Sequence, residues 1–240
     1  MVKILKYELR RLLLNKFFVS LLVINGLFAW YTLASDTVAG IAFTAPFSSW
    51  SFGAYLSSVM PMIIITVLFL LTFYHSRKEK QVEILTAATP VDAFRYMLIR
   101  NTAVTLGFLA LCLLVFGLSI YFYAVYFDFW NYTTFVIPAI VTVVPCFVFI
   151  MGAGHCVGRI HPGFLYFLML VSFAMNFVQI PGEFDLFGGG YYTSAPLTLP
   201  AAMDGEPAFV LSAAFLAARA LYLIIGIVLF VVSVRMDKRK

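Results

Sequence analysis

Residues 62–73 read MIIITVLFLLTF, and this stretch decides the fold class. It contains no charged residue and none of the period-two alternation that a transmembrane β-strand requires. A chain in lipid must satisfy its backbone hydrogen bonds internally, and an α-helix does so within one segment. The stretch therefore predicts a membrane-spanning helix, and we predict an all-α fold.

Further apolar runs lie on both sides of this one. An average soluble domain is about half apolar and about one-quarter charged, whereas this chain of 240 residues is 63% hydrophobic and only 11% charged. So few charges cannot cover a water-facing surface, which excludes a soluble globule. A helical span needs about 20 apolar residues, and we predict one polytopic domain, residues 1–240, with six transmembrane helices. The predicted spans are 17–34, 52–74, 102–126, 133–154, 163–178 and 208–234.

The basic residues predict the orientation of these spans. All but one of the 16 Lys and Arg residues fall before the first span, between the second and third, between the fourth and fifth, or after the sixth. The three opposite connections carry acids and no base: Asp36, Asp128, Glu183, Asp185, Asp204 and Glu206. By the positive-inside rule both termini are cytoplasmic. The net charge of +5 is thus a topology signal and indicates no nucleic-acid partner.

The start of the chain predicts an interfacial amphipathic helix. In residues 1–16 leucines gather on one helical face, and Lys3, Lys6 and Arg10 lie on the other. Such a helix lies on the lipid of an anionic leaflet; the alternative is a charged flank to the first span. The basic start, the apolar run and TLA at 32–34 also resemble a signal peptide. We expect an uncleaved first span, because removal would leave an odd number of spans.

The connection between the second and third spans contains a helix stop and restart. Thr89 is a capping residue, Pro90 takes the first helical position, and Asp92 lies three residues after the cap. One short helix should end before Thr89, and a second should begin at Pro90 and continue into the third span. We predict that residues 77–92 dock a cytoplasmic partner, because a solvated loop, the alternative, would need no such boundary.

Arg219 is the only charged residue deep within a predicted span. A charge at that depth costs at least about 2.5–3.5 kcal/mol on insertion scales, so we expect its side chain to face the protein interior. The outer loop, residues 179–207, is too long for a simple turn and rich in apolar residues, which favours a re-entrant segment between spans five and six. We expect Arg219 to pair with Glu183 or Asp185 of that loop. Asn176 is a further candidate partner, and snorkelling beside lipid is the alternative.

Catalytic and metal-binding motifs are absent from the sequence. No lysine follows a GxxxxG pattern, so there is no Walker A loop, and neither HExxH nor GxSxG occurs. Cys112, Cys146 and Cys156 form no CxxC pair and are interpreted as small hydrophobes. His155 and His161 flank an inner turn and are interpreted as loop histidines rather than haem or metal ligands. We predict no catalytic site, no metal site and no cofactor in this chain.

The connection at 77–92 also carries a recognisable motif. It reads RKE at 77–79, EIL at 83–85 and ATPV at 88–91, which gives an acid, a leucine-rich turn and a Pro-Val dipeptide. In these residues the chain resembles the membrane (permease) subunits of ABC-2-type ABC transporters. The basic helix before the first span, the six spans and the large outer loop extend the resemblance over the whole chain. The family often has a glycine soon after the first acid, where this chain has Lys80 and Gln81.

The resemblance implies a half-transporter that is not itself an enzyme. Two such permease subunits, identical or homologous, pair with two copies of a separate ABC ATPase subunit, which binds ATP and Mg. The segment would then contain a coupling helix that passes the ATPase movement to the spans. Its working residues would be Glu79, Val82, Glu83, Leu85 and Pro90. The resemblance further implies export of a peptide, drug, lipid or glycan across the plasma (cytoplasmic) membrane of a bacterium.

Two other classes of protein remain open. A secondary transporter or channel would need an ion or proton relay, but no second charge accompanies Arg219 within the spans. Nor do the two halves of the chain resemble each other. A non-transporting membrane scaffold needs neither feature and stays an alternative.

Overall fold

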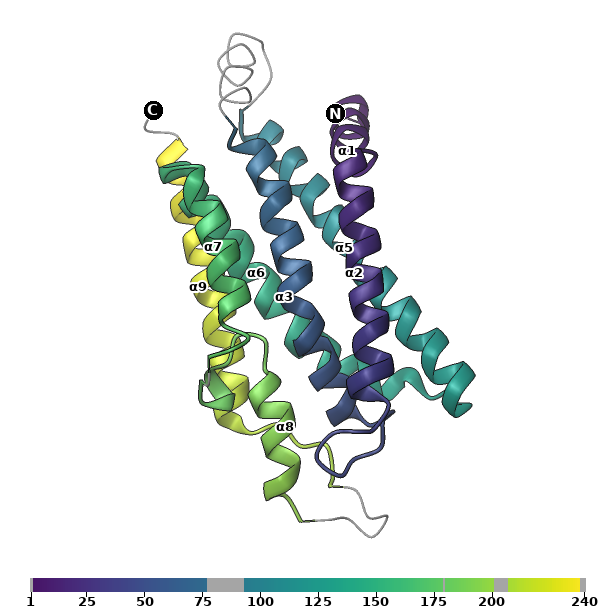
Figure 1. The fold of residues 1–240 in the computed structure, drawn as a ribbon. Coiled ribbons are helices and arrows are strands. Elements are labelled where there is room, and N and C mark those ends of the chain that lie inside the picture. The colour runs from purple at the N-terminus through teal and green to yellow at the C-terminus, as the bar shows by residue number, and fades with distance from the viewer. Residues whose placement is uncertain (1, 77–92, 179, 201–206, 238–240) are drawn as a thin grey trace.

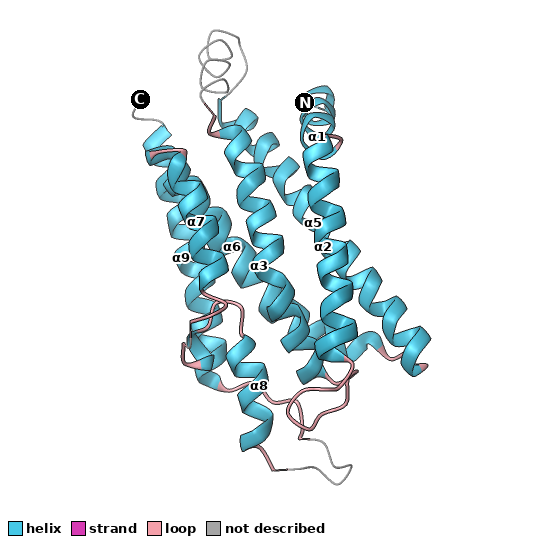
Figure 2. Ribbon diagram, viewed as in Figure 1, coloured by secondary structure: helices cyan, strands magenta, loops and turns pink. Residues whose placement is uncertain are grey.

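Figure 2 shows a bundle of helices joined by loops. The computed structural model describes the whole chain except residues 1, 77–92, 179, 201–206 and 238–240. The described residues form eight α-helices and no β-strand. Five of these helices are long and apolar enough to cross a membrane. The chain is therefore an all-α, multi-pass integral membrane protein, as the sequence predicts.

The five long helices coincide with five of the predicted spans. They are α2 (Lys16–Thr32, extended by the π-helical turn η1, Leu33–Thr37), α3 (Ser49–Tyr74), α5 (Ala93–Phe127), α6 (Val136–Ile160, preceded by the 3₁₀ turn η2, Tyr132–Phe135) and α9 (Ala213–Asp237). Polar caps set two of the starts, since the side chains of Asn15 and Ser48 accept hydrogen bonds from the N–H groups of Phe17 and Ser51. Helix α9 begins later than the predicted span 208–234, and residues 208–212 are not helical.

The fifth predicted span, residues 163–178, is only partly helical. Helix α7 (Gly163–Ala174) has 12 residues, or about 18 Å at the rise of an α-helix, whereas the hydrocarbon core is about 30 Å thick. After it the backbone tightens, since the N–H groups of Asn176 and Phe177 donate to the carbonyls of Phe173 and Ala174. Pro181 then follows and has no N–H to donate. The 3₁₀ turn η3 (Gly182–Phe184) and helix α8 (Gly189–Thr198) complete this region.

Helix α3 is the central element of the bundle. It packs against α2 and α5 and also against α6, α7 and α8, and Figure 1 shows it between α2 and the pair α7 and α9. Its large side chains, including Trp50 and Tyr55, are buried. A second close contact joins α6 to α9, where a Cβ on Gly152 would lie 2.1 Å from the carbonyl oxygen of Gly226. Only glycine lets two helix backbones approach this closely.

The N-terminal helix and the C-terminal end of α9 lie at one end of the bundle (Figure 1). Helix α1 (Val2–Leu13) lies there, set at an angle to α2 because the backbone is extended at Asn15 (ψ 141°). We call this the basic end; it also carries Arg100 of α5 and Arg159 of α6. The opposite, acidic end carries Asp36 and Asp128. This segregation agrees with the predicted topology, and the assignment of the basic end to the cytoplasm stays a prediction.

Candidate functional site

The region between α7 and α8 is a break in helical structure within the bundle. Helix α7 lies in the half near the basic end and α8 in the half near the acidic end (Figure 1), and α3 packs against both. We call residues 175–188, other than residue 179, the break. Irregular backbone is tolerated at membrane depth only where protein or water satisfies its polar groups. The partners of these backbone groups therefore define the first candidate site.

Arg219 of α9 donates hydrogen bonds to two backbone carbonyls of the break. Its side chain is 3% exposed, and its guanidinium donates from Nη2 to the carbonyl oxygen of Asp185 at 2.7 Å and from Nη1 to that of Leu186. The guanidinium also lies 4.3 Å from the ring centroid of Phe215, one turn earlier on α9. One turn later, the Tyr222 hydroxyl donates to the carbonyl of Phe184. One face of α9 thus holds the backbone of the break.

The carboxylate of Asp185 has a separate task at the start of α8. It accepts hydrogen bonds from the N–H groups of Phe187 at 3.0 Å and Gly190 at 3.1 Å. Gly190 lies in the first turn of α8, where backbone N–H groups lack acceptors within the helix, and Phe187 lies just before that turn. Gly188 precedes α8 with a φ of +86°, and a Cβ there would lie 2.8 Å from Nη2 of Arg219. The backbone conformation and the guanidinium both demand glycine at this position.

Arg219 does not form the side-chain pair that we expect from the sequence. Its acceptors are the main-chain carbonyls of Asp185 and Leu186, not the carboxylates of Asp185 or Glu183. Within the described residues Arg219 forms no ion pair. Glu183 lies in η3 and is half-buried, and Asn176 is exposed in the turn after α7. The structure brings Arg219 and Asp185 together and leaves Asn176 outside the site.

A buried aromatic cluster lies beside the break and was not singled out from the sequence. Tyr192 of α8 is fully buried and shares a hydrogen bond of 2.9 Å with the hydroxyl of Thr142 on α6. Tyr191 stacks on Phe215 with ring centroids 4.0 Å apart. The outer loop predicted at 179–207 therefore contains a helix that packs back on the bundle. The signal available in the sequence was the run GGGYY at 188–192.

The second candidate site is a buried acid at the basic end. Glu8 of α1 is 1% exposed. Its carboxylate oxygens accept hydrogen bonds from the hydroxyls of Tyr74 and Tyr96, each at 3.4 Å, and the Arg11 guanidinium lies 3.7 Å away. Arg100 donates to the carbonyl oxygen of Tyr74 at 2.7 Å. We call these five residues the Glu8 cluster.

Residues of the Glu8 cluster lie on both sides of the predicted docking segment in the sequence. Tyr74 is the last residue of α3, and Tyr96 lies in the first turns of α5. The guanidinium of Arg100 lies over the rings of both, 4.3 Å and 5.5 Å from their centroids. Helix α1 is therefore tied to both flanks of residues 77–92. The segment itself lies outside the described residues, and with it the predicted site residues Glu79, Val82, Glu83, Leu85, Thr89, Pro90 and Asp92.

His75, the residue after α3, lies beside His155 of α6, with ring centroids 5.8 Å apart. The Nδ1 atom of His161 accepts a hydrogen bond from the N–H of Gly163 at the start of α7. Across the described part of the chain, no three His, Cys, Asp or Glu side chains are placed to bind one ion.

Comparison with known proteins identifies no relative. No protein-family model, no curated protein and no solved structure matches this chain.

Proposed function

We propose that this chain is the permease subunit of an ATP-driven ABC transporter of the ABC-2 type. The proposal rests on the motif at 77–92 and on one structural observation that supports it. Helix α1 and both flanks of the 77–92 connection meet at the basic end through the Glu8 cluster. A force applied to that connection would reach α1, α3 and α5 together, as a permease driven by a separate ATPase requires.

The proposed complex contains two permease subunits and two copies of the ATPase subunit. The second permease is identical or homologous, and it would cover part of the apolar surface that one chain leaves exposed on α2, α5, α7 and α9. ATP and Mg would bind to the ATPase only. The proposed activity is export of a peptide, drug, lipid or glycan from a bacterial cytoplasm across the plasma membrane.

In this proposal residues 79–88 form the coupling helix. Val82 and Leu85 enter an apolar cleft on the ATPase, and Glu79 and Glu83 meet basic groups on its rim, which orient the contact more than they strengthen it. Pro90, capped by Thr89, stiffens the start of the helix that continues into α5.

The test is capture of the ATPase by the tagged full-length chain from membranes of its native host. We expect mass spectrometry to find a subunit with a Walker A motif, and the captured complex to hydrolyse ATP. Glu83→Lys and Leu85→Asp should lose the ATPase or its stimulation while inserting normally. Glu206→Lys is the matched control, since it makes the same charge reversal in the predicted outer loop.

Two results would contradict the proposal. If both coupling variants retain the ATPase and its full activity, residues 79–88 are only a loop. If no ATPase is captured in any preparation, a secondary transporter, a channel or a membrane scaffold becomes the better interpretation.

A further inference from the structure

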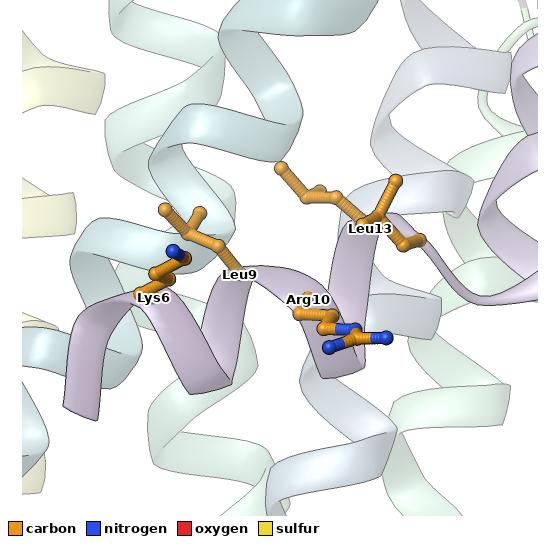
Figure 3. Close-up of a pocket in the computed structure, with 5 residues that line it drawn as sticks. Lys6, Leu9, Arg10 and Leu13 are labelled. Carbon is orange, nitrogen blue, oxygen red and sulfur yellow. The ribbon is translucent and has the colours of Figure 1, made fainter. Parts of the chain in front are cut away.

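The exposed side of α1 carries an open groove. It has a volume of about 310 Å³ and is lined by Lys6, Leu9, Arg10, Leu13 and Leu14 (Figure 3). The three leucines form its apolar wall. Leu14 is 73% exposed, and Phe17, in the first turn of α2, continues the apolar surface at 61% exposed. A water-facing helix would not expose this much apolar surface beside its charges.

Two cations stand along the same groove. Lys6 and Arg10 are exposed and lie one helical turn apart, a rise of about 6 Å. Figure 3 shows both side chains on the part of α1 that also presents Leu9 and Leu13. In the part of the chain that the structure describes, neither Lys6 nor Arg10 forms an ion pair. Arg11 differs, because it turns inward to the Glu8 carboxylate.

The groove thus pairs two positive charges with an apolar wall. A soluble anion would satisfy the charges and leave Leu14 and Phe17 in water, whereas an apolar peptide would leave the charges unused. A ligand that matches both features has an anionic head and a hydrocarbon tail. The position of the groove at the basic end, where membrane-spanning helices begin, is where lipid headgroups lie.

We propose that the groove binds one anionic glycerophospholipid. Lys6 and Arg10 hold its phosphate, and one acyl chain lies along Leu9, Leu13 and Leu14. The bound lipid fixes α1 against the membrane surface. This inference goes beyond the proposed transport function and does not depend on an ATPase partner.

The test measures lipid binding to the purified full-length chain in a neutral detergent. Native mass spectrometry follows titration with phosphatidylglycerol or with phosphatidylcholine of the same acyl chains. Each basic residue near an anionic lipid contributes about a fivefold change in affinity. We therefore expect Lys6→Gln/Arg10→Gln to weaken phosphatidylglycerol binding by about 25-fold, with little change for phosphatidylcholine.

Three controls separate a built site from general attraction to charge. Lys16→Gln removes one charge from the start of α2, outside the groove, and should change phosphatidylglycerol binding little. Leu14→Asn should weaken binding of the full lipid. Glycerol phosphate, which has the head without the tail, should not compete with the lipid.

Several outcomes would overturn the proposal. Equal affinity of the unaltered chain for the two lipids would remove the role of the anionic head. If Lys16→Gln weakens phosphatidylglycerol binding as much as Lys6→Gln alone or Arg10→Gln alone does, the binding reflects general electrostatic attraction to anionic lipid. Competition by glycerol phosphate at the concentrations of the lipid would indicate a site for a soluble anion.

Discussion

Replacing Arg219 with methionine should open the break between α7 and α8 without unfolding the bundle. The substitution removes two hydrogen bonds from a charged donor to the carbonyls of Asp185 and Leu186, each worth about 1.5–3 kcal/mol. It also removes a buried charge, whose cost within a membrane is about 2.5–3.5 kcal/mol. The difference between the centres of these ranges leaves a loss of about 1.5 kcal/mol in local stability, or roughly a tenfold increase in local opening.

Hydrogen exchange of the detergent-solubilised chain measures this opening. We expect faster exchange in peptides covering 182–192, where the N–H groups of Phe187 and Gly190 depend on the position of Asp185. Peptides from α2 and α3 should exchange as before. Arg235→Met, a matched change at the exposed end of the same helix, should leave the break protected. Continued protection of the break in Arg219→Met, or an equal rise in exchange in every helix, would show that Arg219 does not hold the break.

Three further predictions concern other contacts. Glu8→Gln keeps the shape of the side chain but removes the charge that meets the Tyr74 hydroxyl, so α1 peptides should exchange about fivefold faster; unchanged exchange would mean that Glu8 does not hold α1. Gly226→Ala places a methyl group against the α6 backbone, where it would lie 2.6 Å from the carbonyl oxygen of Val148. The substitution should cost about 1–3 kcal/mol and lower the midpoint of thermal unfolding; an unaltered midpoint would refute the close contact of α6 and α9. Asp185→Asn keeps one acceptor for the start of α8, so it should loosen α8 less than Asp185→Ala does in the same exchange measurement.

The long helices could be predicted from the sequence because composition alone determines them. A run such as residues 62–73 has no stable alternative in lipid, and all five long helices fall on predicted spans. The end of α7 could not be predicted in this way, since the apolar run continues through Phe177 and Val178 after the helix has stopped. Hydropathy indicates whether a segment lies in lipid or in water, but it does not indicate where a helix within that segment ends.

Of the candidate sites, too, only part could be predicted from the sequence. The cost of a charge in lipid predicted that Arg219 faces inward, which the structure shows. It did not predict main-chain acceptors, because the break at 175–188, which leaves these carbonyls without partners inside a helix, could not itself be predicted from the sequence. Glu8 was missed for a related reason: its hydroxyl partners, Tyr74 and Tyr96, stand 66 and 88 residues away in sequence. Partners so distant in the sequence produce no recognisable pattern in the residues around Glu8.

The contact between Arg219 and the break has a consequence for how the chain is inserted into a membrane. Its acceptors stand 33 and 34 residues before Arg219 in the chain, so they are synthesised first. When α9 leaves the ribosome, after all the other described helices, the break has already been synthesised, together with α3, which packs against both α7 and α8. The charged helix therefore meets a prepared binding partner instead of bare lipid. The order of the segments along the chain thus favours insertion of the helix that carries the buried Arg219, and moving α9 to an earlier position should make its insertion inefficient.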